Sequence, residues 1–101
     1  MEQLRIYTLV DKETAENYFK ERWSKHIKSL PKFGIEVKGV WIGSTTETEN
    51  QLIAVVSFPD NVDINEVNEL YMKSPDFIEE MKGFDISSMI NVETKIMKSL
   101  F

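Results

Sequence analysis

The sequence predicts an α+β fold with the element order β-α-β-β-α-β, in which helices cover one face of a four-stranded antiparallel sheet. Three observations lead to this prediction. One long segment has apolar residues at helical spacing, four short segments are rich in β-branched and aromatic residues, and glycine, proline or polar residues separate them. With 101 residues, of which 42% are hydrophobic, the chain is expected to form a single domain over residues 1–101.

The first strand is predicted at Leu4–Val10 and the first helix at Thr14–Leu30. Asp11 or Thr14 can cap the start of this helix, and Gly34 is the stop signal beyond its end. Assuming the regular α-helical turn of about 100° per residue, we expect the only histidine to point inward with the apolar side chains. The predicted inward face is Ala15, Tyr18, Phe19, Trp23, His26, Ile27 and Leu30.

The remaining elements follow from similar signals. The second and third strands are predicted at Ile35–Gly43 and Gln51–Phe58, joined by the polar hairpin loop 44–50. A short helix is expected to start at Asp63 or Asn65. A second short helix follows at Ser74-Pro75, where a capping serine precedes a proline at the first helical position. The last strand is predicted as half-buried, and its residues are 89–97.

This order of elements is that of the ferredoxin-like fold, whose helices cover only one face of the sheet. The first and third strands, however, carry apolar residues on both faces. The predicted uncovered face contains Leu4, Ile6, Val10, Ile53 and Val55. Because such a face is unusual on a monomer, we expect a homodimer formed sheet against sheet. The rival interpretation is that the alternation is assigned one residue out, so that the sheet is apolar on one side only.

Composition excludes several classes of function. The net charge of −5 and the scattered Lys and Arg residues argue against nucleic acid as a partner. The longest aliphatic run is too short to cross a membrane, and the start of the chain is unlike an export signal. With no cysteine and one histidine, no metal site is expected. The chain also has no phosphate-cradling glycine loop, and no bound cofactor is expected. We therefore expect a cytoplasmic protein with no membrane contact.

Several motifs together resemble the NIPSNAP family. They are an RxYxL first strand formed by Arg5, Tyr7 and Leu9; an aromatic helix with His26 before a glycine turn; a tryptophan in GVWIG; the strand NQLIAVVSF; and YMKSPDF at 71–77. The chain departs from the pattern at Lys12, where the family usually has glycine. The resemblance implies a dimeric α/β barrel, an architecture shared with small cofactor-free monooxygenases and haem-degrading monooxygenases. It leaves the activity open, because that of the family is not well defined.

Three residues are candidates for chemistry. His26 is either a general base or ligand anchor at a cleft between helix and sheet, beside Tyr7 or Trp41, or a core histidine bonded to a neighbour. Arg5 and Tyr7 lie two apart on one strand face, so both can point into one pocket and orient a carboxylate or enolate. The alternative is an ion pair of Arg5 with Glu93 or another carboxylate, beside a packed tyrosine.

Other side chains are candidates for the wall of the pocket. Arg22 is expected at its edge, with a snorkelling side chain as the alternative to an anion clamp. The paired carboxylates Glu79 and Glu80 are interpreted as a solvated face. The aromatic candidates, which are equally compatible with an ordinary core, are Phe19, Trp23, Trp41, Phe58 and Tyr71.

Three functions are compatible with the sequence. The first is a small dimeric protein that takes up an apolar or partly anionic small molecule, either as a binding protein or as a cofactor-free enzyme. The second is a non-catalytic homodimeric interaction module whose cleft is filled by aromatic side chains. The third is a haem-degrading or antibiotic-biosynthesis-type monooxygenase. Against haem degradation, the positions that match the site of the similar enzymes hold Arg5, Phe58 and Met81.

Overall fold

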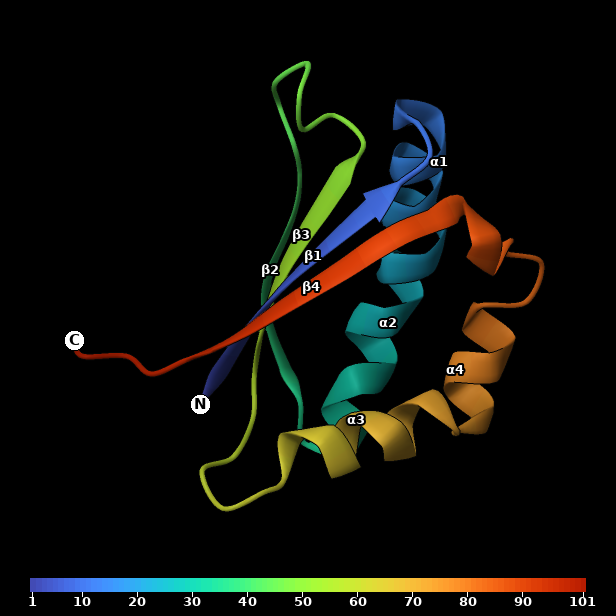
Figure 1. The fold of residues 1–101 in the computed structure, drawn as a ribbon. Coiled ribbons are helices and arrows are strands. Elements are labelled where there is room, and N and C mark those ends of the chain that lie inside the picture. Colours follow the sequence, from blue (N-terminus) through green and yellow to red (C-terminus); the bar gives the residue numbers. More distant parts are fainter.

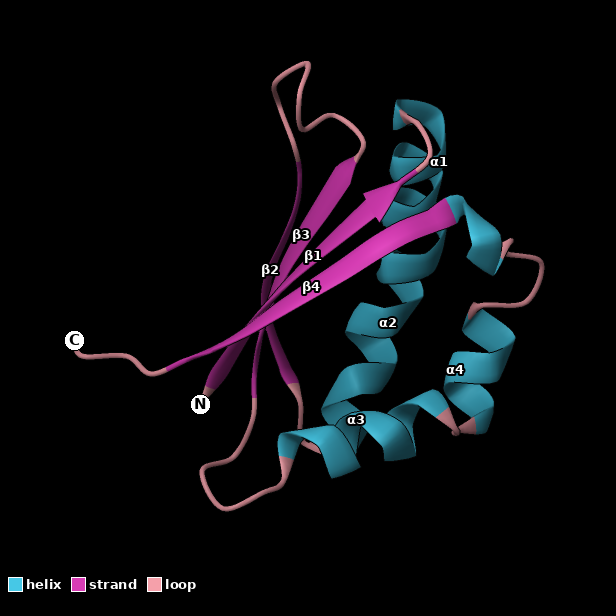
Figure 2. Cartoon of the chain, in the orientation of Figure 1, coloured by secondary structure: helices cyan, strands magenta, loops and turns pink.

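The computed structural model describes residues 1–101 and has the predicted order of elements. Four strands form one antiparallel sheet in the order β2-β3-β1-β4 (Figures 1 and 2). This order is that of a ferredoxin-like fold and confirms the predicted fold class. The elements are β1 (Glu2–Leu9), α1 (Lys12–Asn17), α2 (Ser24–Ser29), β2 (Glu36–Ile42), β3 (Gln51–Ser57), α3 (Ile64–Met72), α4 (Pro75–Glu80) and β4 (Met89–Met97).

The caps predicted for the helices are present. The side chains of Asp11, Asp63 and Ser74 accept hydrogen bonds from the backbone N–H three residues later, which begins α1, α3 and α4. Gly34 ends the first helical segment in the left-handed conformation, with a φ of 77°. Local chemistry therefore sets where α1, α3 and α4 start and where the first helical segment stops.

The first helical segment contains a π-helical turn that the sequence pattern did not reveal. This turn, Tyr18–Trp23, joins α1 to α2, and a 3₁₀ turn at 30–33 completes the segment. A π turn aligns residues five apart, so Tyr18 and Trp23 are buried on the same face. After it, the buried positions are His26, Ser29 and Leu30. Ile27, which regular α-helical periodicity places inward, is exposed.

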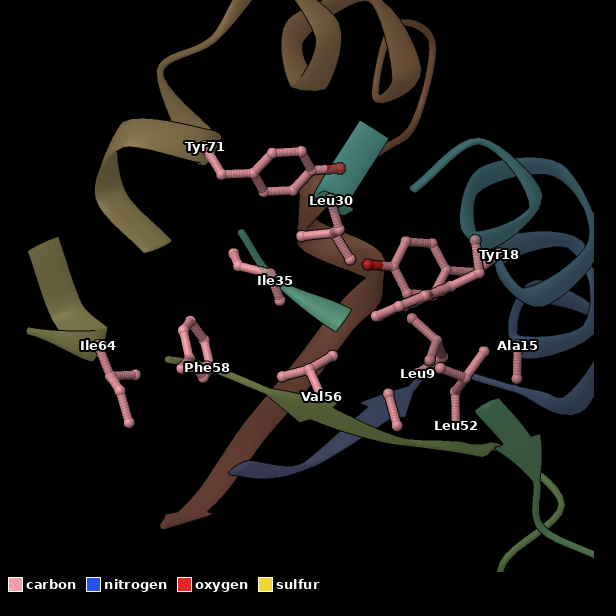
Figure 3. Close-up of a cluster of buried hydrophobic side chains, with 12 residues drawn as sticks. Leu9, Ala15, Tyr18, Leu30, Ile35, Leu52, Val56, Phe58, Ile64 and Tyr71 are labelled. Carbon is pink, nitrogen blue, oxygen red and sulfur yellow. The ribbon is translucent and has the colours of Figure 1, made fainter. Parts of the chain in front are cut away.

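All helices lie on the same side of the sheet, and the other side is bare (Figure 1). The core fills the space between helices and sheet (Figure 3), and most of its residues come from β1, β3, α3 and the first helical segment. From the sheet it takes alternate residues of β3, because successive side chains of a strand point to opposite faces. The core residues are Leu9, Ala15, Tyr18, Trp23, Leu30, Ile35, Leu52, Ala54, Val56, Phe58, Ile64 and Tyr71.

The bare face of the sheet has the alternation that the sequence predicts. Leu4 and Ile6 of β1 pair with Val55 and Ile53 of β3, and all four are half-buried. Trp41 lies on the same face, because it pairs with Ile53, and it is 53% exposed. Its indole covers Gly39, where an added Cβ would stand 2.3 Å from the ring.

The edge strand β4 is more exposed than predicted. Val92 and Ile96 pair with Tyr7 and Gln3 and so face the helical side, yet both are exposed. The helices do not fully cover this edge of the sheet, so β4 can form one side of an opening between helices and sheet.

No helix of the structure has the length and apolar character needed to cross a membrane.

Candidate functional site

A cavity of about 340 Å³ lies between the helices and the β1–β4 edge of the sheet. This volume is within the usual range for small-molecule sites. Most of the wall is apolar or aromatic, with polar side chains at intervals. The lining residues are Gln3, Arg5, Tyr7, Tyr18, Trp23, His26, Leu30, Asn65, Asn68, Tyr71, Met72, Phe77, Met81, Ile86, Met89, Val92 and Thr94.

His26 belongs to a buried hydrogen-bonded cluster on one side of this cavity. Its Nδ1 atom lies 2.7 Å from Oε1 of Glu80 and 2.9 Å from the hydroxyl of Tyr71. The Tyr71 hydroxyl donates to the same Glu80 oxygen at 2.6 Å, and the Ser29 hydroxyl lies 3.1 Å from the Tyr71 hydroxyl. The imidazole also stacks on the ring of Phe77, with 5.6 Å between ring centres. These contacts fix the plane and the direction of the imidazole.

The electrostatics of the cluster favour a neutral His26 beside an ionised Glu80. Burial lowers the pKa of His26, and the hydrogen bond and negative charge of Glu80 offset this only in part. Burial alone would raise the pKa of Glu80, but hydrogen bonds from Tyr71 and His26 bring it below its ordinary value. Burial also raises the pKa of Tyr71, so its hydroxyl remains protonated. A neutral imidazole that donates through Nδ1 carries its lone pair on Nε2.

Arg5 provides a second polar cluster of the cavity wall. It is buried, its Nε donates to Oε1 of Gln3 at 2.9 Å, and its Nη2 donates to Oδ1 of Asn68. None of the ion pairs in the chain includes this guanidinium, so no carboxylate lies within 4.0 Å of it. The predicted alternative of an ion pair between Arg5 and Glu93 is therefore wrong. Burial raises the pKa of the neighbouring Tyr7, and Arg5 counteracts this in part.

Two buried nitrogens of the cavity wall have no hydrogen-bond partner. They are Nε1 of Trp23 and Nε2 of His26, and no other buried side-chain nitrogen or oxygen in the chain is unpaired. The two rings are neighbours in the first helical segment, with 5.2 Å between their centres and an angle of 81° between their planes. Because buried polar groups are normally satisfied, a pair of unsatisfied ones at a cavity suggests a missing partner.

The structure brings together five of the residues singled out in the sequence. Arg5, Tyr7, Trp23, His26 and Tyr71 all line the cavity. Their assembly depends on β1, the first helical segment and α3 meeting near the β1–β4 edge of the sheet.

Four other candidates lie elsewhere, and their placement in the pocket was wrong. Trp41 is on the bare face of the sheet, and Phe58 is in the core at the end of β3. Phe19 packs against the core outside the cavity. Arg22 donates to the backbone carbonyl of Glu80 at 3.4 Å, and its guanidinium lies 6.0 Å from the centre of the Phe84 ring.

Sequence reasoning missed the residues that hold the candidates in position. Glu80 is buried rather than part of a solvated face. Its signal in the sequence is its position three residues after Phe77 in a short helix, which places both on one face. Gln3 lies two residues before Arg5 and so shares its strand face. Asn68 comes from α3, and no local pattern links it to β1.

The chain is similar to solved structures across nearly its whole length. A NIPSNAP-like domain protein from Burkholderia xenovorans matches with a TM-score of 0.77 and 17% identity, over 99% of this chain and 85% of that one. A NIPSNAP family protein of unknown function from Agrobacterium tumefaciens matches with a TM-score of 0.73 and 19% identity, over 97% and 86%. The chain has a NIPSNAP-like fold. The resemblance predicted from the sequence is confirmed at this level.

The NIPSNAP-like fold is also that of other proteins. A putative antibiotic biosynthesis monooxygenase from Bacteroides thetaiotaomicron matches with a TM-score of 0.65 and 16% identity, over 100% of this chain and 90% of that one. No family model matches the chain, and no curated protein matches its sequence. Similarity at such identities concerns architecture, so function has to be argued from the cavity.

Proposed function

We propose that the chain binds a small apolar molecule that carries a negative charge, in the cavity between helices and sheet. The observation that carries this proposal is the buried Arg5, which lines an apolar cavity and has no carboxylate partner in the chain. A buried cation is costly unless it is paired. The carboxylate of a ligand supplies the missing charge and matches the fork of the guanidinium.

The cavity is also the reason to prefer this function over the second hypothesis, a non-catalytic interaction module. That hypothesis expects aromatic side chains to fill the cleft, whereas about 340 Å³ beside His26 is open. The haem-degrading alternative has less support. Of the three positions that match the site of the similar enzymes, Phe58 belongs to the core, and the other two hold Arg5 and Met81.

Thermal shift with matched probes tests the binding proposal. We expect 3-phenylpropionate to raise the melting temperature and the neutral 3-phenylpropanol to do so much less, because only the acid offers a charge to Arg5. The shift should be lost in Arg5→Leu and kept in Arg22→Leu, which changes the only other arginine, outside the cavity. Equal shifts by acid and alcohol, or an unchanged shift in Arg5→Leu, would show that Arg5 is not an anion site.

We further propose that the chain forms a homodimer through the bare face of the sheet. Support comes from the half-buried Leu4, Ile6, Ile53 and Val55 and from the exposed Trp41, which share that face. Ile53→Lys places a charge at the centre of this patch and is expected to give monomer or aggregate. Thr46→Lys, in the exposed hairpin loop, is the control. Light scattering that shows a stable monomer for the unmodified protein would contradict the proposal.

A further inference from the structure

The two unpaired nitrogens of the cavity wall have complementary chemistry. The indole Nε1–H of Trp23 can only donate a hydrogen bond. His26 gives its Nδ1–H to Glu80, at 2.7 Å, so its Nε2 can only accept a hydrogen bond or a proton. A donor and a base on neighbouring rings suit a carbonyl group with an acidic C–H bond beside it. The oxygen accepts from the indole and the carbon gives its proton to the imidazole.

Glu80 equips His26 for this role. In the triad arrangement of acyl-transfer enzymes, a carboxylate bonded to Nδ1 holds the imidazole in the tautomer with a free Nε2 and stabilises the imidazolium that forms. Glu80 is placed in the same way, and Tyr71 steadies its Oε1 atom with a second hydrogen bond of 2.6 Å. Glu80 also lines a surface depression together with Lys25, Lys28 and Lys32, which gives the cluster contact with solvent.

We propose that the cavity binds a 2-oxo carboxylate with an apolar tail and that His26 removes a proton from the carbon next to its keto group. This inference rests on the proposed function, because Arg5 holds the carboxylate. Trp23 donates its Nε1–H to the keto oxygen, and Glu80 is a positioning residue that acts through His26.

The step balances without an oxidant or a metal. The C–H bond breaks, its electron pair forms the C=C bond of the enolate, and the C=O π pair moves to oxygen. The proton passes to Nε2, so the substrate gains one negative charge and the imidazole one positive charge. Return of the proton to oxygen gives the enol. Return of a solvent-derived deuteron to carbon gives C–D. The reaction class is therefore keto–enol tautomerisation, with hydrogen exchange at that carbon.

Phenylpyruvate in D₂O is the direct probe, since it carries a carboxylate, a keto group, an acidic CH₂ and an apolar ring. Loss of its CH₂ signal in proton NMR should be accelerated by roughly 100-fold or more over buffer, the usual contribution of a general base. The acceleration should disappear in His26→Gln and persist in Glu79→Gln, which changes an exposed carboxylate on the same helix. Acceleration that survives in His26→Gln would overturn the inference.

The failure of this inference can be told apart from the failure of the proposed function. If 3-phenylpropionate and phenylpyruvate both raise the melting temperature and no exchange is accelerated, the inference is wrong and the binding proposal stands. If neither binds, the binding proposal itself is wrong.

Nitrogen-15 NMR of the unmodified protein gives a readout that needs no variant to fold. We expect His26 at pH 7.5 to carry its proton on Nδ1 and none on Nε2. The opposite tautomer would overturn the inference. In Glu80→Gln, the side-chain NH₂ can donate to Nδ1 and move the proton to Nε2. The exchange rate should then fall while the KM for phenylpyruvate stays within about twofold, a split that a merely structural role of Glu80 would not produce.

Discussion

Two buried charged side chains, Arg5 on the wall of the cavity and Glu80 in the cluster that holds His26, are accommodated in opposite ways. Glu80 receives two hydrogen bonds, from Tyr71 and His26, and both donors belong to elements packed directly against α4. Arg5 is held by two neutral amides, Gln3 and Asn68, and meets no negative charge within the chain. The charge of Glu80 has its hydrogen-bond partners within the folded protein, whereas the charge of Arg5 has no counter-charge in the chain.

This difference distinguishes a charged group that stabilises the fold, Glu80, from one that is available to a ligand, Arg5. A satisfied buried carboxylate contributes to stability, and removing its donors or the carboxylate itself is costly. A buried cation without a counter-charge contributes little or opposes folding. We therefore expect substitutions at the Glu80 cluster to change mainly the free energy of unfolding, and substitutions at Arg5 to change mainly binding.

The largest effect is expected from Glu80→Ala. It removes an acceptor of two hydrogen bonds to a charged group, each worth about 1.5–3 kcal/mol, so the free energy of unfolding should fall by roughly 3 kcal/mol. Urea denaturation at pH 7.5 measures this. Glu79→Ala, at the exposed neighbouring position, should change it by no more than about 0.5 kcal/mol. Similar effects of the two variants would mean that the Glu80 cluster does not form.

A smaller effect is expected from lowering the pH. His26 has a folded-state pKa below its ordinary value, so near pH 6 the unfolded chain binds more protons at this residue than the folded one. The stabilisation that comes from a neutral His26 is fully present above about pH 6.5 and is lost as the pH falls below that value. Between pH 7.5 and pH 5 we expect a loss of at most about 2 kcal/mol from this group.

His26→Gln isolates the histidine contribution, because glutamine can still donate to Glu80 but does not titrate. The pH dependence of the variant should be flatter than that of the unmodified protein between pH 7.5 and pH 5. A steeper pH dependence in the variant would show that protonation of His26 stabilises the folded protein, which contradicts the prediction. Glu80 does not add to the pH dependence of stability in this range. Its pKa lies below that of an ordinary carboxyl group, so its stabilising effect is lost only at lower pH.

Arg5→Leu should have a smaller effect on stability than Glu80→Ala or the change from pH 7.5 to pH 5. It loses two hydrogen bonds, to Gln3 and Asn68, but also removes a buried charge without a counter-charge. These two effects oppose each other, so the free energy of unfolding should fall by less than about 1 kcal/mol. Urea denaturation of Arg5→Leu, compared with that of Glu80→Ala, measures the change in the free energy of unfolding. A loss as large as that of Glu80→Ala would assign Arg5 to the fold.

How far the sequence predicts the molecule depends on the range of the signals involved. Strand alternation and capping residues are local, and they predicted the order of elements, the two faces of β1 and β3, and the caps Asp11, Asp63 and Ser74. The π turn was missed because the i, i+3, i+4 spacing of apolar residues corresponds to regular α-helical geometry. Its effect is visible at Ile27, which is exposed, and at Ser29, which is buried.

The residues around the cavity were predictable only in part. Arg5 and Tyr7 share a strand face, and His26 and Trp23 share a helical face, so local patterns suggested both pairs. Glu80 was assigned to solvent because glutamate is rarely buried, and its burial depends on donors from α2 and α3. Trp41 was placed in the cleft although its register on β2 puts it on the bare face. Contacts between distant elements decide such positions.

The smallest effect is expected from Ser29→Ala, at the edge of the Glu80 cluster. The Ser29 hydroxyl lies 3.1 Å from the Tyr71 hydroxyl and 3.4 Å from the carbonyl of His26, and both of these groups are neutral. A neutral hydrogen bond contributes about 1 kcal/mol, and alanine recovers part of this through its higher helix propensity, so the net loss should be about 0.5 kcal/mol. Urea denaturation of both variants measures the ratio of the loss of unfolding free energy in Glu80→Ala to that in Ser29→Ala. A ratio near one would mean that the chain of hydroxyls, and not the charge on Glu80, holds His26 in position; a ratio of about six would assign that task to the carboxylate.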